Sequence, residues 1–183
     1  MAENTRPELT RGRVRRARAL PGAEDLEEYL GFRADSEMFA VSLALVREIL
    51  KPPPITEVPR ARSDILGIVS VRGNITTVLD LRRRLRLPPS PPTAQSRVLL
   101  VQGNDEVLGL LVDEVTQVYR LSPAEIEPAA ALLGGASSPH VSGIGRPRMR
   151  GLRGDAETVQ DEVLILLDLA ALLSTDRATV SYG

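Results

Sequence analysis

The stretch from Ile65 to Leu81 constrains the fold of this 183-residue chain more than any other feature. It consists of two short apolar segments, rich in β-branched residues and joined by the triplet Arg72-Gly73-Asn74. Glycine and asparagine both accept positive φ, so we expect a tight turn at Gly73-Asn74 and a β-hairpin around it. Asp80 stands where the N-cap of a short arginine-rich helix belongs. The sequence therefore predicts a fold built from short strands and tight turns.

Similar apolar segments, bounded by turn residues, recur along the rest of the chain. Residues 122–125 have the spacing of a capping box, with Pro123 at the first helical position. Asp168 is placed to cap another short helix, at 169–173. Segment 45–50 fits either a strand or one helical turn, and further strands are expected at 29–33, 38–43, 97–101, 107–112, 141–144 and 163–167.

Two pairs of segments resemble each other and indicate an internal repeat. Val46-Arg-Glu-Ile49 matches Val112-Asp-Glu-Val115, and Val78-Leu-Asp-Leu81 matches Leu166-Leu-Asp-Leu169. Two copies of a small, short-stranded unit predict a mainly β fold, with two β-barrels on one shared core. The two units are expected to divide near the stiff, proline-rich connector at 87–93. Chance similarity between apolar strands is the alternative explanation.

The expected domain organisation has three parts. A leader at 1–24 shows no apolar periodicity and is expected to be disordered. The folded part extends over 25–175, with a first barrel at about 25–88 and a second at about 96–175. This prediction includes the exchange of strands between the two barrels at their ends. Residues 176–183 form a short tail.

The composition excludes most reactive chemistry. With no cysteine and one histidine, His140, expected to be solvated, no zinc site or catalytic triad is expected. Lys51 is the only lysine, so a phosphate-binding P-loop is absent. Asp80 and Asp168 are interpreted as helix caps, and Asp113-Glu114 as the outward side of a strand end. The sequence thus predicts no enzyme and no cofactor, which leaves protein binding as the default.

Arginine is unevenly distributed and suggests a second hypothesis. Residues 1–20 carry six arginines against Glu3 and Glu8. Two further basic clusters, at 82–86 and 146–153, contain no interleaved aromatic residues and are interpreted as a solvated helix face and a mobile loop. The alternative to protein binding is a small β-barrel that binds nucleic acid through its arginine-rich leader and loop.

The chain contains no feature of a membrane or secreted protein. Its apolar runs, such as 163–167, are too short to cross a bilayer, and no apolar segment follows the basic start before Pro21. The absence of cysteine fits a reducing compartment. A cytoplasmic location is therefore expected.

Three groups of residues, in the right order over about 27–174, together resemble the CheW family of chemotaxis coupling proteins. The resemblance implies two five-stranded SH3-like barrels packed on a shared core. The hairpin is the most specific group, and the full set is Gly67, Val71-Arg72-Gly73 and Val78–Leu81, then Gly109–Val118 with Ile126 and Pro128, and finally Phe39–Val41, Val46–Leu50 and Ile55–Pro59.

The same resemblance implies a non-catalytic signalling adaptor without a cofactor. Such a protein couples methyl-accepting chemoreceptors to a CheA-type histidine kinase, in the cytoplasm at membrane-associated receptor arrays. The loop at 146–162 is longer than the family's usual turn, which suggests a dedicated receptor or a non-flagellar pathway. A relative of the kinase's own regulatory domain is a further hypothesis.

Arg72 is the most informative of the site residues that the resemblance implies, because a guanidinium at a hairpin end offers five donors to a partner. Two structural alternatives stay open: Arg72 braces its own barrel, for instance against Asp80, and the aliphatic residues of the set belong to the core. The implied partner-binding residues are Val46, Glu48, Ile49, Arg72 and Gly73.

Overall fold

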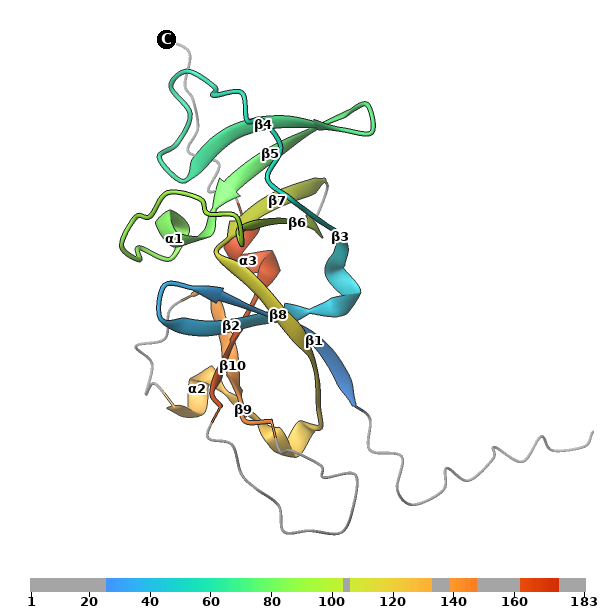
Figure 1. Cartoon of the computed structure of the whole chain (residues 1–183). Coiled ribbons are helices and arrows are strands. Elements are labelled where there is room, and N and C mark those ends of the chain that lie inside the picture. Colours follow the sequence, from blue (N-terminus) through green and yellow to red (C-terminus); the bar gives the residue numbers. More distant parts are fainter. Residues whose placement is uncertain (1–25, 104–105, 133–138, 148–161, 175–183) are drawn as a thin grey trace, which may run out of the picture.

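The fold of the chain consists of two β-sheets, stacked one above the other, with a short helix between them (Figure 1). The computed structural model describes residues 26–103, 106–132, 139–147 and 162–174. In these residues one sheet, here called sheet A, has six strands in the order β8-β1-β2-β11-β10-β9. The other, sheet B, has five strands in the order β3-β6-β7-β5-β4. This confirms the prediction of a mainly β fold.

The elements are short, as the sequence predicts. Sheet A contains β1 (Glu27–Ala34), β2 (Glu37–Ser42), β8 (Glu114–Leu121), β9 (Ile126–Pro128), β10 (Val141–Gly145) and β11 (Leu164–Leu167). Sheet B contains β3 (Val46–Leu50), β4 (Ile65–Val71), β5 (Asn74–Asp80), β6 (Arg97–Gln102) and β7 (Val107–Val112). The helices are α1 (Leu81–Arg84), α2 (Ala129–Leu132) and α3 (Leu169–Leu173), with 3-10 turns η1 (Leu43–Leu45) and η2 (Pro123–Glu125).

The hairpin expected at 65–81 forms, but its turn lies one residue earlier than predicted. Asn74 pairs with Val71 as the first residue of β5, so the two turn residues are Arg72 and Gly73. Both have positive φ, 51° and 86°, as the right-handed twist of a two-residue hairpin requires. Since positive φ is unusual for arginine, the short turn holds Arg72 in a conformation that the sequence did not suggest.

The two sheets are built alike, which supports the internal repeat. In each, a strand runs parallel to its neighbour, β5 to β7 and β11 to β2, and then enters a short helix. Asp80 caps α1 and Asp168 caps α3, each accepting a hydrogen bond from a backbone N–H three residues later. Both helix caps are thus confirmed. The antiparallel neighbours β4 and β10 also match, since each carries a bulge next to a glycine, Gly67 or Gly143.

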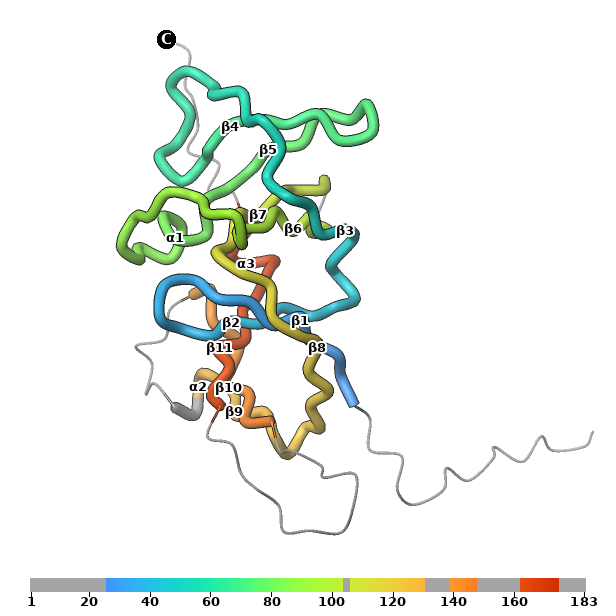
Figure 2. The backbone as a smooth tube through the Cα atoms, in the orientation of Figure 1, coloured from blue at the N-terminus to red at the C-terminus, as the bar shows by residue number. Residues whose placement is uncertain are grey.

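Strand membership crosses the proline-rich connector. The hairpin β1–β2 joins β8–β11 in sheet A, whereas the hairpin β6–β7 joins β3–β5 in sheet B. The chain therefore passes between the sheets twice in the described residues, through η1 and at the junction of β7 with β8 (Figure 2). The barrel boundaries expected at 25–88 and 96–175 stay a prediction.

One apolar core is shared by the two sheets. It includes the stacked rings of Phe32 and Phe39, whose centroids lie 6.3 Å apart. Aliphatic side chains of sheet B and the buried face of α3 complete it. Burial of such side chains contributes roughly 1.5–3 kcal/mol each, so this core holds the halves together. Its buried members are Leu30, Phe32, Ala34, Phe39, Val41, Leu79, Leu81, Leu99, Val101, Leu108, Leu110, Val112, Leu167, Leu169, Leu172 and Leu173.

The two positive-φ glycines of the β4–β5 hairpin give a matched pair of variants. At Gly67, φ is 148° and a Cβ would overlap the carbonyl oxygen of Thr56, whereas at Gly73 no atom lies within 4 Å of that position. We expect Gly67→Ala to lower the free energy of unfolding by about 3 kcal/mol and Gly73→Ala by only about 1 kcal/mol. Urea denaturation checks both values. Equal losses would contradict the close approach at Gly67.

Candidate partner-binding site

The end of the β4–β5 hairpin lies next to the opposite edge strand of sheet B. The Arg72 Nη2 donates to Glu48 Oε1 of β3 at 2.8 Å. The Arg72 side chain is 78% exposed and that of Glu48 is 31% exposed. Since β3 and β4 are the two edges of the sheet, this ion pair connects strands that do not pair through their backbones.

A groove of about 350 Å³ lies beside this ion pair. At the hairpin tip, Ile75 is 68% exposed, more than any other large apolar side chain of the described residues. The lining of the groove combines apolar and charged side chains, which is the composition of a protein-binding surface. The groove is lined by Arg47, Glu48, Val71, Arg72, Asn74, Ile75, Thr76, Leu100, Glu106 and Val107.

The structure brings together three of the five residues that the sequence assigned to a partner surface. Glu48, Arg72 and Gly73 meet at the hairpin end. Ile49, 42% exposed, does not line the groove. Val46 is half-buried and packs against the shared core. Whether these residues contact a partner stays a prediction.

Ile75 is a surface residue that the sequence reasoning missed. A signal for it was present, because an apolar residue next to a tight turn, at the end of a two-residue hairpin, has few neighbours to cover it. Arg72 does not brace its barrel against Asp80, but its pair with Glu48 lies within the same sheet, so the wider bracing alternative stays a prediction. Asp80 instead pairs with Arg83, at 3.2 Å, and Arg72 pairs with Glu48.

Two of the three α1 arginines, Arg82 and Arg84, are not part of the solvated helix face that the sequence indicated, whereas Arg83 is exposed as expected. The Arg82 side chain is only 13% exposed and donates through Nε and Nη2 to the Asp113 carboxylate, at 2.7–3.0 Å. Its Nη1 reaches the carbonyl oxygen of Pro88 at 2.7 Å and a carboxylate oxygen of Asp35 at 3.3 Å. Arg84 donates to main-chain carbonyl oxygens at the end of α3. These side chains are structural.

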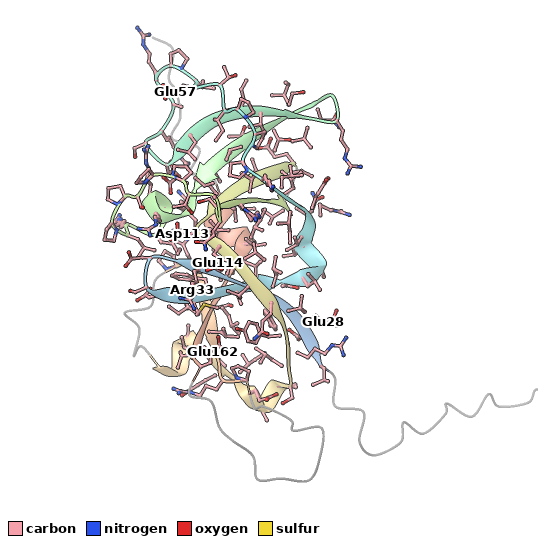
Figure 3. All side chains as sticks on the ribbon, viewed as in Figure 1. Glu28, Arg33, Glu57, Asp113, Glu114 and Glu162 are labelled. Atoms are coloured by element: carbon pink, nitrogen blue, oxygen red, sulfur yellow. The ribbon has the colours of Figure 1, made fainter. Side chains whose placement is uncertain are left out.

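Asp113 also differs from its prediction as an outward-facing residue. It lies between β7 and β8, where the chain passes from sheet B to sheet A, beside Glu114 and Arg33 (Figure 3). Its carboxylate accepts from Arg82 and from the backbone N–H of Asp35, the latter at 2.7 Å. Burial by itself would raise the pKa of Asp113, but these hydrogen bonds outweigh it and hold the pKa below 3.8.

A buried carboxylate supports the base of the hairpin. Asp64 is 8% exposed and accepts from Arg62 at 2.6 and 3.0 Å and from Arg84 at 3.3 Å. Burial raises the pKa of Asp64, whereas the two arginines and the backbone lower it by more, so the net direction is downward. Both carboxylates are therefore ionised parts of the folded structure at neutral pH.

His140 is not the solvated loop residue that was expected. It is half-buried, and its Nδ1 has no hydrogen-bond partner among the described residues. Burial, reinforced by the charge of Arg84, lowers the pKa of His140 below 6.5, so the ring is neutral at pH 7. The basic cluster at 146–153 and the leader lie largely outside the described residues.

Within the described ranges, no three His, Asp or Glu side chains gather into a metal site, and no helix is long and apolar enough to span a membrane. The described surface instead offers a groove lined by apolar and charged side chains, among them the paired Arg72. A groove of this composition is typical of a surface that binds other proteins.

Comparison with known proteins identifies the family. The model of the CheW-like domain matches residues 28–177, so the chain belongs to the CheW family. It is a non-catalytic chemotaxis scaffold, an adaptor that couples chemoreceptors to the kinase CheA.

Two relatives carry the family name. A probable chemotaxis protein CheW of Rhizobium etli is 30% identical over 148 residues, which is 80% of this chain and 87% of the relative. The chemotaxis protein CheW of Bacillus subtilis is 34% identical over 103 residues, 56% of this chain and 66% of the relative.

Two further similarities concern another relative and a solved structure. Protein PilI of Pseudomonas aeruginosa is 30% identical over 115 residues, 63% of this chain and 65% of the relative. The crystal structure of the scaffolding protein TtCheW from Thermoanaerobacter tengcongensis superposes with a TM-score of 0.70 at 24% identity, over 82% of this chain and 94% of that one. The last similarity confirms the fold.

The contrast between Arg82 and Arg72 predicts opposite effects on stability. Removing Arg82 leaves the Asp113 carboxylate without its main partner, so Arg82→Ala should lower the free energy of unfolding by about 2–4 kcal/mol. Arg72→Ala removes an exposed pair and should cost less than about 1 kcal/mol. Chemical denaturation measures both. A large loss for Arg72→Ala would favour a bracing role.

The lowered pKa values predict acid sensitivity. Because the folded state lowers the pKa of Asp64 and Asp113, their contribution to stability is complete above about pH 4 and is lost as pH falls through the lowered values. Stability measured from pH 6 to pH 2.5 should fall steeply below pH 4. In Asp113→Asn, which starts less stable, the fall should be shallower. Parallel profiles for the two proteins would contradict this assignment.

Proposed function

We propose that this adaptor contacts its partners, a CheA-type histidine kinase and a methyl-accepting chemoreceptor, through the exposed end of the β4–β5 hairpin and the neighbouring edge strand β3. The contact residues are Val46, Glu48, Ile49, Arg72 and Gly73. The observation that carries this proposal is the exposed Arg72–Glu48 pair at the margin of the groove.

The geometry of Arg72 suits recognition more than bracing. Its ion pair uses one Nη2 hydrogen, and the side chain is 78% exposed, so donors remain for a carboxylate or carbonyl oxygen of a partner. Glu48 restrains the guanidinium beforehand, which reduces the conformational entropy lost when a partner binds. Gly73 permits the turn that presents Arg72.

Apolar contact is proposed on both sides of the ion pair. Ile75 lies at the hairpin tip within the groove lining, and Ile49 lies on the other face of β3. Interfaces commonly combine a buried apolar anchor with polar groups at the rim. Val46 supports β3 from the shared core, so its share in the contact is smaller.

The pathway and the location are part of the proposal. We place the protein in the cytoplasm, at membrane-associated receptor arrays. A dedicated receptor or a non-flagellar pathway stays part of the proposal, because the sequence at 146–162 is longer than the family's usual turn. Nucleic-acid binding through the leader and the 146–162 loop stays a prediction without further support, since most of these residues lie outside the described ranges and the α1 arginines are engaged within the fold.

A matched arginine pair tests the site. Arg120 of sheet A is 70% exposed and pairs with Glu28 at 2.9 Å, much as Arg72 pairs with Glu48. We expect Arg72→Ala to weaken binding to the kinase or the receptor by about tenfold, because a desolvated partner group loses its donor. Arg120→Ala should bind as the wild type does.

Titration calorimetry with the purified kinase, and kinase activity in receptor-containing membranes, provide the readouts. Both variants should melt within a few degrees of the wild type, since each loses only a surface pair. Unchanged binding and kinase stimulation in Arg72→Ala would place the partner surface elsewhere.

A further inference from the structure

Helix α1 consists of four residues, of which three are arginines that reach different parts of the molecule. Arg82 binds Asp113, at the passage from β7 to β8, and Asp35, in the β1–β2 turn of sheet A. Arg84 donates to the carbonyl oxygens of Leu172 and Ser174, at 2.8 and 2.9 Å. Because α1 follows β5 of sheet B, Arg82 connects that sheet to the β7–β8 junction and the β1–β2 turn of sheet A, and Arg84 connects it to the helix that follows β11 of sheet A.

Arg83 makes no such connection among the described residues. Its Nη1 donates to the carbonyl oxygen of Ser63 at 3.0 Å, and its Nε pairs with Asp80, and both acceptors belong to the β4–β5 side of the molecule. Arg84 also donates to Asp64 on the β4–β5 side at 3.3 Å, so the same short helix contains two arginines with contacts beyond that side and one, Arg83, without them. Arg83 therefore serves as the internal control for Arg82 and Arg84.

The shared core cannot by itself define the angle between the sheets. Apolar packing is non-directional, and packed layers can slide on one another by small amounts. A guanidinium fork that binds a carboxylate through two nitrogens has a fixed direction, and a low exposure of 13% for Arg82 shields it from salt. Arg82 reaches the β7–β8 junction and the β1–β2 turn, and Arg84 reaches the end of α3, which follows β11 of sheet A, so together they resist rotation as well as separation.

We propose that Arg82 and Arg84 are positioning residues that fix the angle between sheets A and B. The consequence for signalling rests on the proposed function. The angle sets where a partner bound to the hairpin of sheet B stands relative to a second partner bound elsewhere on the adaptor. Coupling requires both partners to be held in one geometry at the same time. Loss of Arg82 or Arg84 therefore impairs signal transfer more than it impairs either binary contact.

The absence of native cysteine makes the angle measurable. Exposed Ser70 of β4 and exposed Gln117 of β8, one on each sheet, are replaced by cysteine and spin-labelled. Double electron–electron resonance then gives the distribution of distances between the sheets. It is recorded for the labelled parent protein and for Arg82→Ala, Arg82→Lys, Arg84→Ala and Arg83→Ala.

We expect one narrow distance in the parent and in Arg83→Ala, and a broader or shifted distribution in Arg82→Ala and Arg84→Ala. Arg82→Lys keeps the charge but not the fork, so it should broaden the distribution as well, and it serves as the milder variant if Arg82→Ala does not fold. Folded variants with the narrow parental distance would overturn the proposal.

A functional measurement separates the structural claim, that the arginines fix the angle between the sheets, from the functional claim, that this angle is needed for signal transfer. In Arg84→Ala and Arg82→Lys, binding to each partner alone should stay near the wild-type value, while receptor control of the kinase falls by about tenfold. Broadened distances with full receptor control would overturn the functional claim and leave the structural claim in place. If Arg72→Ala also leaves binding unchanged, the failure lies in the proposed surface, because the distance measurement does not depend on it.

Discussion

The ion pair between Arg82 and Asp113 is the contact on which the arrangement of this adaptor depends. It lies where the chain passes from one sheet to the other, and it binds a third element, the β1–β2 turn, through Asp35. A carboxylate at this point would be costly to bury alone, and an unpaired guanidinium equally so. Pairing Arg82 with Asp113 removes this cost at the β7–β8 junction, next to the apolar core that the two sheets share.

Much of the fold is visible in the sequence because its signals are local. Alternating apolar segments, the two aspartate caps and the glycine-containing hairpin each follow from a few neighbouring residues, and all appear in the structure. The family pattern then supplied the architecture. The turn shifted by one residue because Arg72 adopts positive φ, which side-chain preference alone does not predict.

The candidate site and the arginine contacts show where sequence reasoning ends. A run of arginines on a short helix usually indicates a solvated face. No residue near 82–84 in the sequence indicates that Asp113 or the end of α3 is a hydrogen-bond partner of these arginines. The Arg72–Glu48 pair joins residues 24 positions apart through strands that do not pair. Such contacts depend on how the sheets exchange hairpins, and only the three-dimensional fold reveals that exchange.

The hairpin exchange also has a consequence for how the chain folds during synthesis. Every strand of sheet B has left the ribosome once residue 112 has emerged, so that sheet can form early. In sheet A, β2 is covered on one side by β11, whose residues 164–167 come near the end of the described chain. The β1–β2 hairpin is thus synthesised first but gains its last neighbouring strand late. Until β11 has been synthesised, the unpaired edge of β2 must avoid pairing with other chains, as in any protein whose strand pairing is long-range.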